Sequence, residues 1–372
     1  MMNSGGDIRL ALFCFLVSFA FTVAAMPGVF LVCRKWNLYD LPGGRKVHHN
    51  AIPRLGGALF LPALLLAVGV GLVVSGGNPS LVVHASSLLL ASGAWLIYLV
   101  GLVDDTVGVS ARHKFIFQIG ASAVLPGCNL YVNHLYGLFG LYDVPLWLGY
   151  FLTVFWVLLV VNAINLIDGI DGLASSLVMM SLAVFAWLFA LDHAWLFVVS
   201  SCALMGAVAA FFLYNMWGRP ERGTKIFMGD SGSLILGYAL AYLSVKYAML
   251  NPADEPATDA GRLVWPLTVL LIPVADLVRV AFGRMLRGRS FFSADKTHLH
   301  HKLLRLMPMR CALLVICLLY VLLGGLAALL LQAGWGVTPI LLVQVLFFTA
   351  VNFLLNVLIR RRSGASSASV TG

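Results

Sequence analysis

Residues 161–173 read Val161-Asn162-Ala163-Ile164-Asn165-Leu166-Ile167-Asp168-Gly169-Ile170-Asp171-Gly172-Leu173, and the rest of the chain is organised around them. This acidic, glycine-bearing stretch lies directly between two long apolar runs. A carboxylate at membrane depth is costly, so an ionisable residue there indicates a functional site. The two glycines permit unusual backbone dihedrals and close approach of a ligand. The stretch therefore predicts a polar binding site where two apolar helices meet.

Composition places these apolar runs in a membrane. The chain has 372 residues, of which 61% are hydrophobic and only 10% are charged. A soluble globular domain does not need that much apolar surface, so we expect a polytopic membrane protein. The first apolar run lacks a basic leader and a small-residue cleavage site, which favours a retained span over a signal peptide. The six cysteines form no CxxC pair, so neither a zinc site nor a disulfide framework is indicated.

The apolar runs predict the number of spans. A membrane-spanning helix needs about 20 mainly apolar residues. By that measure we expect an all-α protein with eleven transmembrane helices, forming one integral membrane domain over residues 1–362 with a short flexible tail at 363–372. The fourth span is the least well defined, because Pro126 and Gly127 interrupt it. The expected spans cover residues 8–33, 55–75, 82–103, 114–132, 146–166, 173–191, 195–215, 231–250, 263–281, 310–332 and 337–359.

The basic residues predict the orientation of these spans. Among the 24 lysines and arginines, all but Arg9, Lys246 and Arg262 fall on one side of the expected membrane. The positive-inside rule therefore places the N-terminus outside and the C-terminus in the cytoplasm. The same basic face would attract anionic lipids and phosphorylated substrates.

With this topology, every unusual polar segment falls at the cytoplasmic side. Carboxylates with an amide oxygen are the hard ligands that magnesium or manganese prefers. Histidines and lysines beside them can hold phosphate oxygens. A zinc site at the histidines is disfavoured, because Lys296 and Lys302 flank them and no cysteine is near. Besides the opening stretch, the segments are residues 101–105, 112–114, 227–233 and 296–302, with Asp40 as a further candidate.

Each segment also has an ordinary structural interpretation. Asp230 or Ser231 could cap the start of a helix. The adjacent acids at 104–105 could open a solvated loop, although neighbouring carboxylates repel unless a cation or a shared proton relieves them. Asp276 and Arg279, three residues apart, look like an intrahelical ion pair. The convergence of all segments on one face favours a functional site over these separate explanations.

Four motifs together resemble a known family, the polyprenyl-phosphate N-acetylhexosamine-1-phosphate transferases. The resemblance extends from Arg34 through His301, in the family's order and number of spans. The histidine motif is interrupted by Leu299 and followed by Lys302, which favours the N-acetylglucosamine branch over relatives that transfer phospho-N-acetylmuramoyl-pentapeptide. The motifs are Val103-Asp104-Asp105, residues 162–173, Phe227-Met228-Gly229-Asp230 and His298-Leu299-His300-His301.

The resemblance implies a reaction. UDP-GlcNAc and undecaprenyl phosphate would give undecaprenyl-pyrophosphoryl-GlcNAc and UMP, the first membrane step of O-antigen or common-antigen type polysaccharide synthesis. Such a transfer depends on positioning and charge neutralisation, so Mg²⁺, or alternatively Mn²⁺, is the expected cofactor. The expected location is the cytoplasmic face of the bacterial inner membrane, in contact with membrane lipid. No nucleic-acid partner is expected, and the resemblance allows a homodimer.

The resemblance also assigns roles to matching positions. Asn165 and Asp230 would bind the metal ion, and Asp171 would read the uracil. The catalytic candidates would be Asp104 and Asp105 on the lipid-phosphate side, as base or electrostatic guide, and Asp168 between metal and nucleotide. The other nucleotide and phosphate contacts would come from Lys114, Asn215, His298, His300 and His301.

Two other interpretations stay open. Within the class, the donor could be another UDP-N-acetylhexosamine or UDP-linked N-acetylmuramoyl-pentapeptide. From another class, charged residues near spans also mark ion pathways of secondary transporters. A transporter should place its charges near the bilayer midplane and often contains repeated halves. This sequence shows clusters at span ends and no visible repeat, which favours the enzyme.

Overall fold

The computed structural model describes residues 4–40, 51–76, 85–249, 259–288 and 297–368. The described chain is mostly helical, which confirms the prediction of an all-α polytopic membrane protein. Seven described helices are long and apolar enough to cross a membrane, or up to eight if one bent pair forms a single span. The count of eleven spans and the orientation of the termini stay predictions. The chain divides into two compact units.

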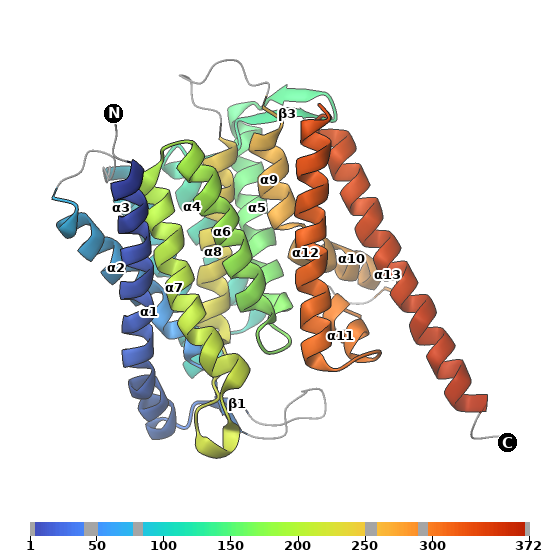
Figure 1. The fold of residues 1–372 in the computed structure, drawn as a ribbon, viewed down its shortest axis with the longest axis horizontal. Helices are drawn as coiled ribbons and strands as arrows, with labels where there is room; N and C mark the ends of the chain where they lie inside the picture. The colour runs from blue at the N-terminus through green and yellow to red at the C-terminus, as the bar shows by residue number, and fades with distance from the viewer. Residues whose placement is uncertain (1–3, 41–50, 77–84, 250–258, 289–296, 369–372) are drawn as a thin grey trace. The chain divides into compact units, whose positions relative to one another are not determined.

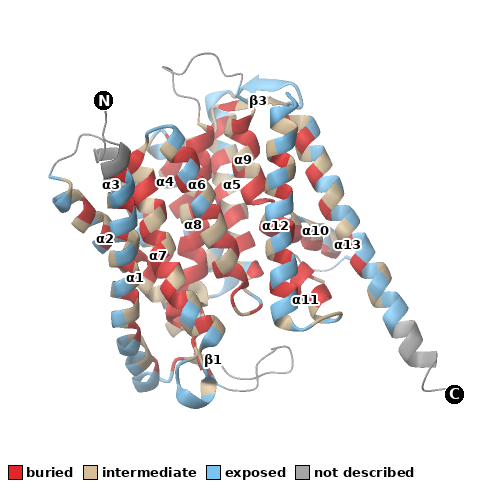
Figure 2. Cartoon of the chain, in the orientation of Figure 1, coloured by how far each residue is buried: buried red, intermediate tan, exposed pale blue. Residues whose placement is uncertain are grey.

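Unit 1 comprises residues 1–132 and 145–249. Helix α1 packs against α2 and α7, and α7 packs against α6 (Figure 1). Helix α8 contacts α3, α5 and α6, and most of its residues are buried (Figure 2). The helices are α1 (Ser4–Lys35), η1 (Gly56–Leu59), α2 (Phe60–Val74), α3 (Ala85–Thr106), α4 (Ala111–Gly127), α5 (Leu146–Ile167), α6 (Leu173–Leu191), α7 (Trp195–Trp217), η3 (Pro220–Arg222) and α8 (Gly229–Ala248).

The start of α8 is fixed by backbone contacts with η1 and α3. A Cβ atom added to Gly57 would lie 2.1 Å from the Cα of Gly232, and one added to Gly101 would lie 2.5 Å from the Cα of Ser231. The Gly57 amide also donates to the Met228 carbonyl at 2.8 Å. These close approaches leave no room for side chains, so they determine where the first turn of α8 lies.

A short antiparallel pair precedes η1 in unit 1. Strand β1 (Tyr39–Asp40) pairs with β2 (Ile52–Pro53), with Asp40 opposite Ile52. The Pro53 carbonyl then accepts a hydrogen bond from the Phe227 amide at 2.8 Å. Asp40, a further candidate in the sequence analysis, therefore pairs with the strand whose Pro53 carbonyl binds the segment just before α8. The basic residues at 45 and 46 lie outside the described residues.

Unit 2 comprises residues 133–144 and 250–372. Its hairpin, formed by β3 (His134–Leu138) and β4 (Leu141–Asp143), was not predicted from the sequence. The ninth expected span is broken, because α9 and α10 meet at an angle of 65°. Pro273 explains the break, since its ring conflicts with the carbonyl four residues earlier, at the end of α9. The helices are α9 (Gly261–Val269), α10 (Leu271–Met285), α11 (Leu299–Leu304), α12 (Met309–Gln332) and α13 (Val337–Ala368).

The predicted domain boundary near the C-terminus stays a prediction. Helix α13 is described through Ala368, and residues 369–372 lie outside the described part. The single domain over 1–362 and the flexible tail at 363–372 are therefore retained as expectations.

Candidate active site

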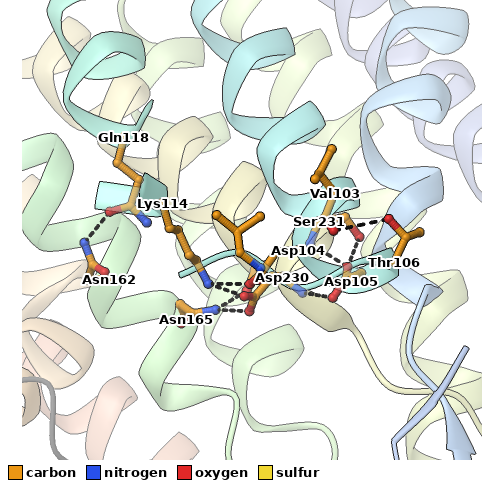
Figure 3. A network of polar contacts seen from close by, with 12 residues as sticks. Val103, Asp104, Asp105, Thr106, Lys114, Gln118, Asn162, Asn165, Asp230 and Ser231 are labelled. Carbon is orange, nitrogen blue, oxygen red and sulfur yellow. Dashed lines mark hydrogen bonds and ion pairs between the residues drawn. The ribbon is translucent and has the colours of Figure 1, made fainter. Parts of the chain in front are cut away.

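Four helices of unit 1 bring together polar side chains that are far apart in the sequence (Figure 3). The Lys114 ammonium lies 3.1 Å from Oδ2 of Asp104 and forms an ion pair with Asp230. The Asn165 amide donates to Oδ1 of Asp230 at 2.6 Å. The Lys114 and Asp104 side chains are each 16% exposed and that of Asp230 is 25% exposed, so the group is accessible to a ligand. We call Asp104, Lys114, Asn165 and Asp230 the acidic cluster.

The short connection between α3 and α4 explains why Lys114 lies beside Asp104. Helix α3 ends at Thr106, and Ser110 caps the start of α4 by accepting from the His113 amide. The Val109 amide donates to Oδ1 of Asp104 at 2.6 Å. The tight connection therefore fixes the Asp104 carboxylate while it turns the chain so that the first turn of α4 faces it.

Asp105, the next residue, has a different environment from Asp104. Its carboxylate accepts hydrogen bonds from the Asp230 amide at 2.8 Å, the Ser231 amide at 2.8 Å and the Ser231 hydroxyl at 2.7 Å. Asp105 is only 4% exposed. Helix α8 has no side-chain cap of its own, so Asp105 supplies from α3 the acceptors that its first amides need. Asp105 thus holds Asp230 in place through the backbone.

The opening stretch forms a turn between α5 and α6. Asp168 follows the last residue of α5, and Gly172, the residue just before α6, has a positive φ of 78°. The Gly172 amide donates to the side-chain oxygen of Asn215 at 2.7 Å, and the Asn215 amide donates to the Ile226 carbonyl at 2.9 Å. Asn215 is buried, so its described contacts join this turn to the segment that leads into α8.

The two acids of the turn differ electrostatically. Asp171 forms an ion pair with Lys225, a basic residue that the sequence analysis did not include among the site candidates. Removal from water raises the pKa of Asp168 to about 7, and the nearby carboxylates of Asp171, Asp230 and Asp105 add to the increase. Asp168 can therefore exchange a proton near neutral pH.

A second polar pair lies one turn deeper on the same two helices. The Asn162 amide donates to the side-chain oxygen of Gln118 at 2.9 Å, which joins α5 to α4 (Figure 3). Gln118 is one helical turn from Lys114, and Asn162 is close to one turn from Asn165. This pair therefore joins the two helices that carry Lys114 and Asn165, about one turn from each of those residues.

The acidic cluster is chemically suited to a hard divalent cation. It offers two carboxylates and the side-chain amide of Asn165. A flip of that amide exchanges its oxygen and nitrogen, so that the oxygen can face a cation. Among the described residues no group of three or more His, Cys, Asp or Glu side chains could hold a metal ion by itself. Magnesium commonly binds through one or two carboxylates and takes further ligands from water and substrate phosphates. The donor set therefore fits a divalent-cation site that substrate completes.

The histidine motif lies in unit 2, at the start of α11. Nδ1 of His298 lies 2.8 Å from Oδ2 of Asp276 on α10, and the Leu299 amide donates to Oδ1 of Asp276 at 3.0 Å. Arg279 pairs with Oδ1 of Asp276 at 2.6 Å, which confirms the predicted intrahelical ion pair. The same carboxylate thus also holds a histidine 22 positions later, a contact that was not predicted from the sequence.

The three histidine rings of the motif lie close together, with those of His298 and His300 buried and stacked. The ring of His300 is 5.8 Å from that of His298 and 4.3 Å from that of His301. Burial and the neighbouring His301 lower the pKa of His300 to about 3, so this ring is neutral at physiological pH. Lys302 donates to the side-chain oxygen of Asn352 at 3.0 Å, and burial lowers its pKa to about 8.

Comparisons with known proteins show the family to which the chain belongs. Residues 87–248 match the family described as glycosyl transferase family 4. The chain is 30% identical over 315 residues to a probable undecaprenyl-phosphate N-acetylglucosaminyl 1-phosphate transferase of Bacillus subtilis (strain 168), covering 82% of this chain and 80% of the relative.

Two further relatives come from other bacteria. The undecaprenyl-phosphate alpha-N-acetylglucosaminyl 1-phosphate transferase of Escherichia coli (strain K12) is 30% identical over 276 residues, covering 74% of this chain and 71% of the relative. The decaprenyl-phosphate N-acetylglucosaminephosphotransferase of Mycobacterium leprae (strain TN) is 35% identical over 292 residues, covering 71% of this chain and 69% of the relative. All three names describe transfer of the same phosphosugar to a polyprenyl phosphate.

Proposed function

This chain belongs to glycosyl transferase family 4, and from that membership we propose that it transfers GlcNAc-1-phosphate from UDP-GlcNAc to undecaprenyl phosphate, releasing UMP. The product is undecaprenyl-pyrophosphoryl-GlcNAc, the starting lipid for O-antigen or common-antigen type polysaccharide. The observation that carries this proposal is the acidic cluster, in which one ammonium, two carboxylates and an amide from four helices meet within hydrogen-bonding distance.

In the proposed reaction, an oxygen of the lipid phosphate attacks the phosphorus that bears the sugar. The bond from that phosphorus to the bridging oxygen breaks, and its electron pair leaves with UMP. Little covalent chemistry is required of the protein, so catalysis depends on positioning and on neutralising the charge of the phosphates. A bound Mg²⁺, or Mn²⁺, would supply much of that neutralisation, with Asn165 and Asp230 as its protein ligands.

The other residues of unit 1 receive roles that follow from their contacts. Asp104 orients Lys114, whose ammonium then holds a phosphate oxygen of the substrates. Asp105 acts indirectly, because its oxygens are engaged by the start of α8. Asp168 is the proposed proton acceptor for a protonated lipid phosphate, since its pKa lies near neutrality.

The nucleotide would be recognised by the turn that Asn215 supports. Asp171 would accept a hydrogen bond from the uracil edge, with Lys225 holding its carboxylate in place. Asn215 maintains the turn through its contacts with Gly172 and Ile226. The histidines of unit 2, His298, His300 and His301, would bind phosphate oxygens of the donor.

We also propose the membrane arrangement. The chain would cross the bacterial inner membrane eleven times, with its N-terminus in the periplasm, its C-terminus in the cytoplasm and the active site at the cytoplasmic face. This orientation follows from the distribution of lysines and arginines. Membrane lipid would surround the protein, and a homodimer is compatible with the family.

The direct test uses purified full-length protein in detergent with UDP-GlcNAc, undecaprenyl phosphate and magnesium. We expect UMP release that requires both substrates and stops when the divalent ion is chelated. Absence of UMP release with every UDP-sugar tried would remove the enzyme interpretation.

A panel of donors then separates the alternatives within the class. We expect UDP-GlcNAc to give a higher kcat/KM than other UDP-N-acetylhexosamines and UDP-linked N-acetylmuramoyl-pentapeptide. A clear preference for another donor would keep the reaction type and change the sugar. A secondary transporter, in contrast, would move a solute across proteoliposomes without releasing UMP.

A further inference from the structure

Asp276 is a buried carboxylate that sequence analysis predicts only as half of an intrahelical ion pair. It lies on α10, is 1% exposed, and contacts three groups on two elements of unit 2. Oδ1 accepts from Arg279 and from the Leu299 amide, while Oδ2 lies 2.8 Å from Nδ1 of His298. A carboxylate this buried is costly unless it is well paired, so its contacts define the place of the residues that it holds.

The contact with His298 determines the chemistry of that ring. An ionised carboxylate can only accept hydrogen bonds, so Nδ1 of His298 must carry the hydrogen. Nε2 is then the ring atom left for a ligand. When Nε2 also carries a hydrogen, it donates a hydrogen bond to an anionic oxygen.

Other contacts hold the segment around His298 and limit its freedom to turn. Arg279 donates to the Thr297 carbonyl at 2.6 Å, immediately before the histidine. Lys302 is held by Asn352 of α13 at 3.0 Å, and Arg362 of α13 donates to the Leu306 carbonyl at 2.9 Å after α11. The histidine motif is therefore supported from α10 at its start, where Asp276 contacts the His298 imidazole, and from α13 at its end.

We propose that Asp276 is a positioning residue of the transfer reaction, which fixes His298 so that Nε2 contacts a phosphate oxygen of the nucleotide donor. The proposal rests on the proposed function, since it assigns His298 to the pyrophosphate of UDP-GlcNAc. Asp276 acts through His298 and does not itself touch the substrate. Its effect should fall on the step in which negative charge moves onto the departing UMP, because a fixed donor is most effective where charge develops.

The test is a double-mutant cycle in purified full-length protein. Asp276→Asn keeps the shape of the side chain but replaces the charged acceptor by an amide. We expect kcat to fall about 10- to 100-fold, as for other residues that orient a functional histidine, with the KM for UDP-GlcNAc changed less than about threefold. In a His298→Gln background the same change should lower kcat less than about threefold, because the group through which it acts is gone.

Two further variants separate positioning from folding. Asp276→Glu retains the charge and should recover part of the rate lost in Asp276→Asn, even if both melt at lower temperature than the wild type. Gln344→Met removes a different buried polar contact of unit 2, that with Thr268, and should retain activity within about twofold.

Wild-type kcat in Asp276→Asn would overturn the proposal, as would a loss in the His298→Gln background equal to that in the wild type. Failure of Asp276→Glu to exceed Asp276→Asn would also overturn it, because a retained charge would then have no effect. If the wild-type protein itself releases no UMP, the proposed function fails, and that outcome is distinct from the others.

Discussion

The acidic cluster of unit 1 and the histidine motif of unit 2 are built in opposite ways. The acidic cluster gathers Asp104, Lys114, Asn165 and Asp230 from four helices, and its members contact one another while staying partly exposed. The histidine motif is contiguous in the sequence, nearly all buried, and held by residues outside it. In the acidic cluster the opposite charges stabilise one another, whereas in the histidine motif the imidazole rings are held by residues outside the motif. Substitutions should therefore affect activity directly in the first region and through geometry in the second.

The largest expected effect tests the direct role of the acidic cluster. Asp230→Asn removes a carboxylate that faces both the proposed cation and Lys114, so we expect UMP release to fall about 10²- to 10³-fold. Thermal unfolding in detergent should change little, since Asp230 is partly exposed. Asp143→Asn, in the exposed strand β4, is the matched control and should keep wild-type turnover. Wild-type rates in Asp230→Asn would remove this residue from the site.

The next prediction compares neighbouring acids within unit 1. Asp105→Asn weakens the acceptor for two amides of α8, and leaving such groups unsatisfied costs about 1–3 kcal/mol. We expect its melting temperature to fall, while Asp104→Asn keeps its stability and loses nearly all turnover. Thermal unfolding and UMP release measured on both variants check this. If Asp104→Asn were the less stable protein, the division between reactive and supporting carboxylates would be wrong.

The third prediction concerns the pH dependence of stability. Asp168 has a pKa of about 7 in the fold against 3.8 ordinarily, so the folded protein binds its proton more tightly than the unfolded chain does. The resulting stabilisation is fully present below the ordinary pKa and is lost as the pH rises through about 7. Relative to Asp168→Asn, the wild type should therefore lose melting temperature between about pH 4 and pH 7. Parallel melting curves would contradict the raised pKa.

The smallest expected effect concerns the ion pair beside the turn. Lys225→Met leaves Asp171 without its cation, and a partly exposed pair of this kind contributes about 1 kcal/mol or less. We expect the KM for UDP-GlcNAc to rise up to about fivefold, with kcat preserved, because binding of the nucleotide is affected and the transfer step is not. Steady-state kinetics with UDP-GlcNAc as the varied substrate decide this. A drop in kcat alone would place Lys225 at the reacting phosphates.

Much of the helical arrangement follows from the sequence, because each expected span is a long apolar run and such runs form helices in a membrane. The break between α9 and α10 was missed, although Pro273 marks it, since the hydrophobicity continues across the break. The hairpin at 134–143 was missed because its mixed residues carry no clear alternation.

The site was predictable where charge is placed beside an apolar run. Asp104, Lys114, Asn165 and Asp230 stood out for that reason, and the structure brings them together. The supporting contacts were not predictable. The hydrogen bond between Asp105 and the start of α8 joins residues 126 positions apart, and neither segment contains a pattern that predicts the contact. Side chains such as Lys225 and Asp276 look like ordinary basic or paired residues until folding selects their neighbours.

The contact between Gly57 and Gly232 has a consequence for protein engineering. With a Cβ atom at Gly57 only 2.1 Å from the opposite backbone, neither an insertion nor a larger residue fits there without moving Asp230. A mutant library designed to change sugar specificity should leave these two glycines unchanged, since nearly every replacement there would be inactive for the same geometric reason. Variation is better introduced at partly exposed side chains away from this contact, where replacement leaves the start of α8 in place.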